Sequence, residues 1–138
     1  MRWKLAVPVL MLLIVLLLAG CRNPQLFEKT FTLEDFEQEP NQTWYIPGVR
    51  GQDELEVTLY SNPSTGYAWR IARADERGIL EKAGSPVFNP PEGNMVGAAG
   101  TETWTFKIKE RGAGFVIMEY IREFGDEEPL WTLEIVVE

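Results

Sequence analysis

Hydrophobic and polar residues alternate along most of the chain from residue 43 onward. The clearest run places Trp104, Phe106 and Ile108 between threonine and lysine neighbours, and residues 54–60 alternate in the same way. A period of two predicts β-strands with one buried face and one face in water. Turn residues separate the runs, and the expected strands cover residues 43–46, 54–60, 67–71, 79–87, 103–108, 115–121 and 131–137.

These strands predict an all-β fold, namely an immunoglobulin-like β-sandwich of about seven or eight short antiparallel strands. Residues 115–121 are apolar on both faces apart from Glu119, which is typical of a central strand. Trp104 and Trp131 occupy inward positions of alternating strands, so we expect both in the core. The chain has no long helical period, although residues 73–82 are compatible with a short turn of helix.

The first 20 residues predict a secretory signal peptide. Arg2 and Lys4 precede an apolar run over residues 5–19, and small residues stand directly before Cys21. The run is shorter than the roughly 20 residues that a membrane-spanning helix needs, which favours a cleaved signal over a transmembrane anchor. Residues 18–21 (Leu-Ala-Gly-Cys) also resemble the lipobox of bacterial lipoproteins. That resemblance implies an exported protein, held in the inner or outer membrane of a bacterial cell envelope by lipid on Cys21.

We therefore divide the chain into three parts. Residues 1–20 form the signal peptide, and residues 21–42 contain the lipidated cysteine and an N-terminal tether. The tether mixes polar residues with isolated aromatic ones, and within it residues 29–36 fit a weak edge strand. Residues 43–138 form the folded domain, which is expected to be single because of its length.

Composition excludes several kinds of function. The chain has 138 residues, no histidine and one cysteine, so it lacks the groups for Ser-His-Asp or Cys-His catalysis and for an internal disulfide. Ser61, Ser64 and Ser85 have no lysine or glycine-elbow context that would activate them. A net charge of −8 provides no basic footprint for nucleic acid. We expect neither enzymatic activity nor a cofactor or metal site.

Three turn regions are longer and richer than a plain connection between strands requires, and they cover residues 61–69, 93–100 and 120–129. In an immunoglobulin-like order they are the B–C, D–E and F–G loops, and the B–C and F–G loops lie at one end of the sandwich. Pro63 fixes its own φ angle, and Gly66 permits a positive one. The B–C loop is therefore expected to have a stiff polar tip.

The same loops carry a family resemblance. Residues 62–69 (Asn-Pro-Ser-Thr-Gly-Tyr-Ala-Trp) resemble the Asn-Pro-Thr-Thr-Gly-aromatic-x-Trp loop of the chagasin-type inhibitors of papain-like cysteine proteases. In that family a small, glycine-rich loop comes next and leads into a strand of alternating aromatics, which residues 97–107 resemble. A later strand ends in Tyr-x-Arg-Pro-Trp, and residues 120–124 are similar in place and spacing. The resemblance extends from about residue 43 to residue 137.

The resemblance implies a tight, reversible, non-covalent inhibitor of papain-like (clan CA) cysteine proteases that acts as a monomer. Its three loops would form a wedge in the active-site cleft, with Ser64 and Thr65 facing the catalytic centre. Residues 97–100 would run along the cleft, and residues 122–124 would pack on its far wall. The implied protease-binding residues are Asn62, Pro63, Ser64, Thr65, Gly66, Tyr67, Gly97, Ala98, Ala99, Gly100, Arg122, Glu123 and Phe124.

A second hypothesis is a non-inhibitory envelope lipoprotein that uses the same end of an immunoglobulin-like domain as a protein-interaction module. The sequence departs from the family pattern at Ser64, which replaces a threonine, and at Ala99, which replaces a glycine. Glu123 and Phe124 stand where the family has Pro-Trp, and this departure is the main support for the second hypothesis.

Overall fold

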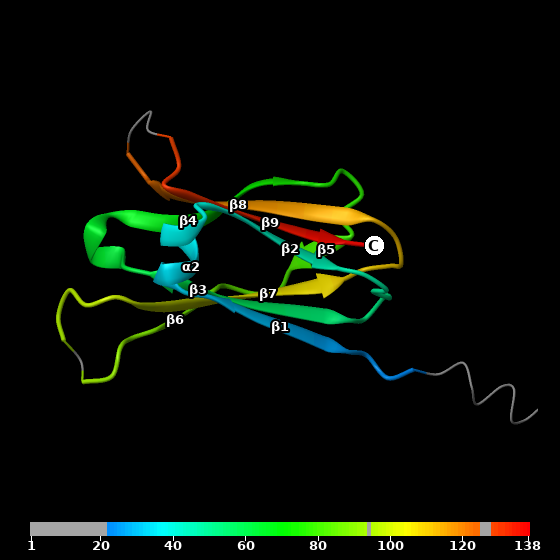
Figure 1. Cartoon of the computed structure of the whole chain (residues 1–138). Coiled ribbons are helices and arrows are strands. Elements are labelled where there is room, and N and C mark those ends of the chain that lie inside the picture. Colours follow the sequence, from blue (N-terminus) through cyan, green and yellow to red (C-terminus); the bar gives the residue numbers. More distant parts are fainter. Residues whose placement is uncertain (1–21, 94, 125–127) are drawn as a thin grey trace, which may run out of the picture.

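Two β-sheets packed face to face make up the fold of the computed structural model, which describes residues 22–93, 95–124 and 128–138 (Figure 1). The predicted signal peptide and Cys21 lie outside the described residues. The first sheet has the order β1-β3-β7-β5, with β6 also paired to β7, and the second has the order β2-β9-β8-β4. The strands are β1 (Leu26–Phe31), β2 (Asn41–Ile46), β3 (Glu54–Ser61), β4 (Tyr67–Ala74), β5 (Leu80–Lys82), β6 (Val87–Asn89), β7 (Gly100–Ile108), β8 (Gly114–Arg122) and β9 (Trp131–Val137).

The first sheet is built around the antiparallel pair β3 and β7. Leu55 lies opposite Phe106 and Val57 lies opposite Trp104, so the apolar residues of both alternating runs share the inner face. All four of these side chains are buried. The period of two therefore produces the expected half-buried strands, because a strand places alternate side chains on opposite faces.

The second sheet pairs β8 antiparallel with β4 and β9, while β2 pairs with β9 in parallel. In the first sheet β1 also pairs in parallel, with β3. The β-sandwich is thus confirmed, but two of its strand pairings are parallel, where the sequence predicted antiparallel strands throughout. Parallel neighbours need a long connection between them, and here the chain crosses between the sheets before it returns.

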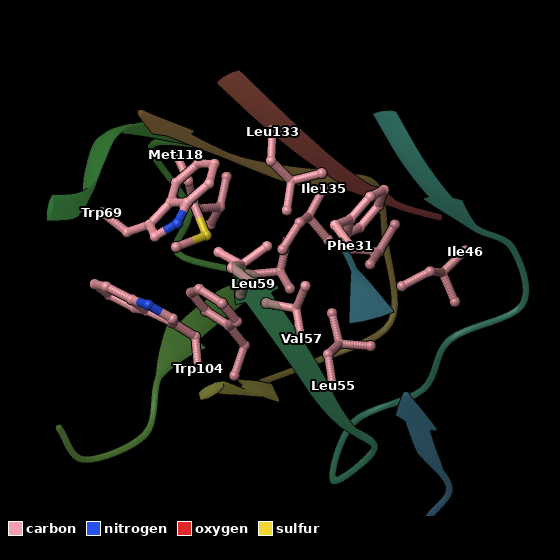
Figure 2. Close-up of a cluster of buried hydrophobic side chains, with 14 of the residues drawn as sticks. Phe31, Ile46, Leu55, Val57, Leu59, Trp69, Trp104, Met118, Leu133 and Ile135 are labelled. Carbon is pink, nitrogen blue, oxygen red and sulfur yellow. The ribbon is translucent and has the colours of Figure 1, made fainter. Parts of the chain in front are cut away.

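The core lies between the two inner faces. Figure 2 shows Leu133 and Ile135 of β9 facing the side chains of β3, among them Val57 and Leu59. Leu133 and Ile135 are fully buried. Trp104 and Trp131 are 5% and 8% exposed, which confirms the prediction that both belong to the core.

The segment before residue 43 differs most from its prediction. Residues 26–31 form β1, residues 33–38 form the short helix α2 (Leu33–Gln38), and β2 already begins at Asn41. Phe31 and Phe36 are each 1% exposed and belong to the core. The prediction of a tether over residues 21–42 therefore does not hold for residues 26–42. The isolated aromatic residues were the visible sign that this segment folds onto the core, because a large apolar ring in a polar stretch needs an apolar partner.

Helix α2 begins at Leu33, within the weak edge strand that the sequence predicted over residues 29–36. Thr32 is its N-cap: the Thr32 hydroxyl accepts a hydrogen bond from the Asp35 N–H at 3.3 Å, and the Asp35 carboxylate accepts one from the Thr32 N–H at 2.7 Å. This reciprocal capping box satisfies two backbone donors that a helix start otherwise leaves unpaired. Hydrogen bonds that the Thr32 N–H and the Thr32 hydroxyl donate to the Asp35 carboxylate hold the pKa of that carboxyl below its usual range.

The short helical turn that was compatible with residues 73–82 is absent. Strand β4 extends to Ala74, a turn follows, and β5 begins at Leu80. The expected strand over residues 79–87 is split into β5 and β6, which pair with different parts of β7. Within the described ranges, no helix is long and apolar enough to cross a membrane.

The connections at the two ends of the sandwich differ. The turn after β3, the β6–β7 connection and the β8–β9 connection all lie at one end, on the left in Figure 1. The first described residues and the C-terminus lie at the other end. We call the end with the three connections the loop end.

Candidate functional site

The tip of the loop end is a tight turn, η1 (Pro63–Thr65), between β3 and β4. The N–H and the hydroxyl of Thr65 both donate hydrogen bonds to the Asn62 carbonyl oxygen, at 3.1 and 2.6 Å. The Gly66 N–H donates to the Pro63 carbonyl oxygen at 3.1 Å, and Gly66 has a φ of +80°. A residue with a side chain rarely adopts that φ, so the glycine is required by the turn. Hydrogen bonds between near neighbours in sequence therefore stiffen the tip.

The base of the turn is held by Tyr120 of β8. Its hydroxyl accepts a hydrogen bond from the Asn62 N–H at 2.9 Å, although the two residues are 58 positions apart in sequence. The Tyr120 ring is 2% exposed and stacks on Trp131, with 5.0 Å between the ring centroids. Burial raises the pKa of Tyr120, and the Asn62 N–H offsets part of that effect. Tyr120 thus joins the turn to the core.

Below the turn, the aromatic side chains form a continuous cluster. Phe36 of α2 stacks on Trp131 with 5.1 Å between ring centroids, and it also packs against Trp69 at 5.3 Å. The Trp69 indole N–H donates to the Tyr60 carbonyl oxygen at 2.8 Å, close to the end of β3. Aromatic pairs of this kind stabilise beyond the area that they bury. The helix that the sequence did not predict therefore supports the floor of the tip.

Ser64 connects the tip to the β6–β7 connection. Its hydroxyl oxygen lies 2.6 Å from Asn62 Oδ1 and 3.1 Å from the carbonyl oxygen of Gly97, and it has one proton to donate. The Ala98 N–H donates to the Met95 carbonyl oxygen at 3.1 Å, which closes a turn within the connection. Ser64, which stands where the family pattern has a threonine, thus connects the predicted B–C and D–E loops.

Gly100 has a structural role in this connection. It is the first residue of β7, and a Cβ atom there would overlap the Asn89 carbonyl oxygen and lie 2.9 Å from Cζ of Phe88. Only glycine lets β6 approach β7 this closely. Gly100 was predicted to contact a protease. In the structure, the close approach of β6 explains why this position has no side chain.

The β8–β9 connection lies on the other side of the tip. Arg122 is opposite Tyr67 in the β4–β8 register, and its guanidinium lies over the Tyr67 ring at 4.8 Å from the centroid. Glu123 and Phe124 follow the end of β8, and the Phe124 side chain is 92% exposed. Residues 125–127 of the predicted F–G loop lie outside the described residues.

Two small hollows flank the tip. One, of about 280 Å³, lies between the tip and the β6–β7 connection, and the other, of about 230 Å³, lies between the tip and the end of β8. A larger hollow of about 810 Å³ lies near the start of β8, and it contains none of the predicted site residues. The predicted residues therefore form a ridge at the tip with a recess on each side.

Sequence reasoning missed several residues at the loop end. Phe88, Met95 and Val96 are large apolar side chains with exposed fractions of 41%, 69% and 104%. Phe88 belongs to β6 (Val87–Asn89), whereas the strand expected from the sequence ended at residue 87. An apolar pair directly before Asn89-Pro90-Pro91 was the available signal, because a strand that ends at two prolines cannot be central.

Glu102 is the one acidic side chain at an inward position of β7. It belongs to the same face as the buried Trp104 and Phe106, and the Ser61 hydroxyl donates to its Oε2 at 3.3 Å. Burial raises the pKa of Glu102, and the hydrogen bond from the Ser61 hydroxyl offsets only part of that effect. The folded state therefore holds the Glu102 proton to a higher pH than the unfolded state does.

This shift predicts a pH-dependent effect of Glu102→Gln on stability. A raised pKa in the folded state contributes stability below the unfolded-state pKa, and this contribution is lost as the pH rises through the folded-state pKa. Glu102→Gln should therefore raise the free energy of unfolding relative to the parent at pH 7, and the gain should shrink toward pH 4. Urea unfolding at several pH values measures it, and a difference that is constant with pH would contradict the assignment.

No group of three or more side chains suited to bind a metal ion occurs among residues 22–93, 95–124 and 128–138. The polar groups of the tip are hydroxyls and amides that bond to each other and to backbone. This arrangement presents a rigid surface to a partner.

The loop order and geometry agree with a family of known proteins. Residues 48–137 match the model of the chagasin family of peptidase inhibitors, I42. The chain belongs to the chagasin family. Chagasin of Trypanosoma cruzi is 34% identical over 74 residues, which cover 49% of this chain and 64% of chagasin, just under two thirds of its length. Membership in a family of inhibitors confirms the prediction that the chain is not an enzyme.

Solved structures agree on the fold of this chagasin-family chain. The crystal structure of the cysteine protease inhibitor EhICP2 from Entamoeba histolytica has a TM-score of 0.57 and 25% sequence identity, and the match covers 84% of this chain and all of that one. The solution structure of Amebosin has a TM-score of 0.51 at 21% identity, with the same coverage. The match over 84% of the chain extends beyond residues 43–138, in accord with the folded β1 and α2.

Proposed function

We propose that this chagasin-family protein is a tight, reversible, non-covalent inhibitor of papain-like cysteine proteases, whose three loops enter the active-site cleft. The observation that carries the proposal is the joining of the loops into one edge. Ser64 at the tip contacts Gly97 of the β6–β7 connection, and Arg122 at the end of β8, directly before the β8–β9 connection, lies over Tyr67 at the start of β4. The similarity to EhICP2, a cysteine protease inhibitor, and to chagasin, whose family consists of peptidase inhibitors, supports it.

The physical properties of the edge suit this function. A turn fixed by its own hydrogen bonds loses little conformational entropy when it docks, so more of the contact energy becomes affinity. The exposed ring of Phe124 beside Arg122 provides the aromatic and arginine anchors that dominate many interfaces. Glu123 and Phe124 replace Pro-Trp but leave an aromatic side chain at the edge.

The proposal is tested with purified residues 22–138, which contain every element of the described fold. Titration against papain and a cathepsin L-like enzyme should give competitive inhibition with one inhibitor per enzyme. Full protease activity at micromolar concentrations of a folded inhibitor would contradict it. If that result were accompanied by capture of a different envelope protein through the loop end, the interaction-module hypothesis would replace it.

The hydrogen bond between Tyr120 and Asn62 predicts that Tyr120→Phe weakens inhibition moderately. Tyr120→Phe keeps the buried ring but leaves the Asn62 N–H without its acceptor, which loosens the base of the tip. Loss of about 1 kcal/mol, the usual contribution of such a bond, corresponds to about a fivefold higher inhibition constant against papain. Tyr45→Phe is the matched control, because the Tyr45 hydroxyl bonds to Glu138 near the opposite end. Equal inhibition constants for both variants would show that the Tyr120 bond does not position the tip.

We further propose that Cys21 carries lipid and holds the protein on a membrane of the cell envelope. Several acyl chains on one residue give a firm anchor, whereas a single chain binds only marginally. Arg22 directly follows Cys21 in sequence and forms an ion pair at 3.2 Å with the buried Asp53, which directly precedes β3 and so lies at the opposite end of that strand from the tip. An anchor at that end would leave the three loops pointing away from the membrane.

The anchor is tested by cell fractionation of the full-length chain and of Cys21→Ser. We expect the parent in the membrane fraction, labelled by a fatty-acid probe. The variant should lose the label and leave that fraction. Equal distribution of the two proteins would contradict lipid anchoring, and it would leave the inhibition proposal standing.

A further inference from the structure

The hollow between the tip and the β6–β7 connection is apolar on most of its surface. Residues of three segments line it, namely Pro63, Ser64, Phe88, Pro90, Pro91, Met95, Gly97 and Ala98. The lining contains no charged side chain, and its one hydroxyl, on Ser64, already has acceptors within the protein. A group that enters this hollow therefore finds apolar surface and few free hydrogen-bond partners.

The hollow is held open by contacts within the fold. Phe88 lies opposite Glu102 in the β6–β7 register, and its ring edge rests over the bare backbone of Gly100. On the opposite rim, the Ser64 hydroxyl oxygen lies 3.1 Å from the Gly97 carbonyl oxygen, which is a direct contact between the tip and the β6–β7 connection. Because strand pairing and a loop-to-loop contact set its two sides, the hollow exists before any partner binds.

The size of the hollow and the exposure of its apolar lining indicate that it can hold a large side chain of a partner. A volume of about 280 Å³ exceeds the roughly 150 Å³ of an apolar cavity known to bind benzene, so one large side chain fits. Phe88 and Met95 are 41% and 69% exposed, and clustered exposed apolar side chains mark interaction surfaces. The hollow shares Pro63, Ser64, Gly97 and Ala98 with the predicted protease-binding edge, and it is therefore continuous with that edge.

We propose that this hollow receives an apolar side chain from the cleft wall of the target protease, and that Phe88 and Met95 thereby determine which papain-like protease is bound. The inference rests on the proposed inhibitory function and goes beyond it, because neither residue is among the protease-binding residues that the family resemblance implies. A protease with a charged side chain at the matching position would bury that charge without a partner. Such burial is costly, so the hollow selects against those enzymes.

The test compares inhibition constants against papain for Phe88→Ala, Met95→Ala and Met95→Glu. We expect about a fivefold rise for each alanine variant, mainly through faster dissociation, and a larger rise for Met95→Glu. Leu26→Ala is the matched control, since Leu26 is a similarly exposed apolar residue (52%) at the start of β1. Thermal unfolding of each variant accompanies the assay, and Met95 is exposed enough that its variants should keep the parent's unfolding midpoint.

A photo-crosslinking residue identifies the occupant. Benzoylphenylalanine in place of Phe88 should couple to a peptide from the wall of the papain cleft, and mass spectrometry should place the link at an apolar residue. Unchanged inhibition constants for both Met95 variants, or a link outside the cleft, would overturn the inference while papain is still inhibited by the parent. Absence of inhibition by the parent would instead overturn the proposed function.

Discussion

Thr65→Arg should raise the inhibition constant against papain at least tenfold while the domain stays folded. Thr65 is exposed at the tip, and its hydroxyl closes the turn by donating to the Asn62 carbonyl oxygen at 2.6 Å. Arginine removes that bond and places a long cation where the proposed edge enters the cleft. Side chains at the centre of an interface dominate its binding energy, so the loss should exceed that of any other single change at the edge.

Two controls separate the tip from general effects of the substitution. Thr65→Ser keeps the hydroxyl and should inhibit nearly as well as the parent. Thr43→Arg makes the same change at an exposed position of β2, away from the three loops, and should leave inhibition unchanged. If Thr65→Arg inhibits as strongly as Thr43→Arg, the tip does not enter the cleft.

Phe36→Ala should lower the free energy of unfolding by about 3–5 kcal/mol, the usual cost of removing a buried aromatic ring. The Phe36 ring is 1% exposed and packs on Trp131 and Trp69, with 5.1 and 5.3 Å between the ring centroids. For a domain of this size the loss corresponds to a fall in Tm of roughly 10–20 °C. Urea unfolding and differential scanning calorimetry measure both quantities.

Glu37→Ala is the control for Phe36→Ala. Glu37 is the next residue of α2 and is exposed, so its replacement should change stability by no more than about 0.5 kcal/mol. A similarly small effect of Phe36→Ala would mean that residues 26–42 form a tether after all. A chain beginning at residue 43 should be less stable still, because it lacks both β1 and α2.

Local patterns were sufficient for the fold class and for the tip. Alternation placed Leu55, Val57 and Trp104 on an inner face, and each is buried in the structure. Pro63 and Gly66 predicted a stiff turn, and the hydrogen bonds of that turn join residues no more than three positions apart. Both predictions depend on near neighbours in sequence, which is why they could be made without a tertiary structure.

Prediction was weaker where a residue's role depends on a distant partner. Residues 26–42 lack strong alternation, and their place in the fold comes from the parallel pairing of β1 with β3 and from the contact of Phe36 with Trp131. Gly100 was predicted to contact a protease from its resemblance to the family's glycine-rich loop, but nothing in the sequence showed that a Cβ atom there would also overlap the Asn89 carbonyl oxygen of β6. Phe88 was overlooked because its exposure depends on how β6 pairs with the edge of β7.

The sequence by itself determined that this chain forms strands with one buried face, that its tip is stiff, and that it lacks the histidine that Ser-His-Asp and Cys-His catalysis both require. Only the tertiary structure decided how the tip is held and what lies beside it. Tyr120 reaches Asn62 across 58 positions, and Ser64 reaches Gly97 across 33. A strand's period follows from its own backbone geometry, whereas these contacts depend on which of many strand pairings buries the most apolar surface.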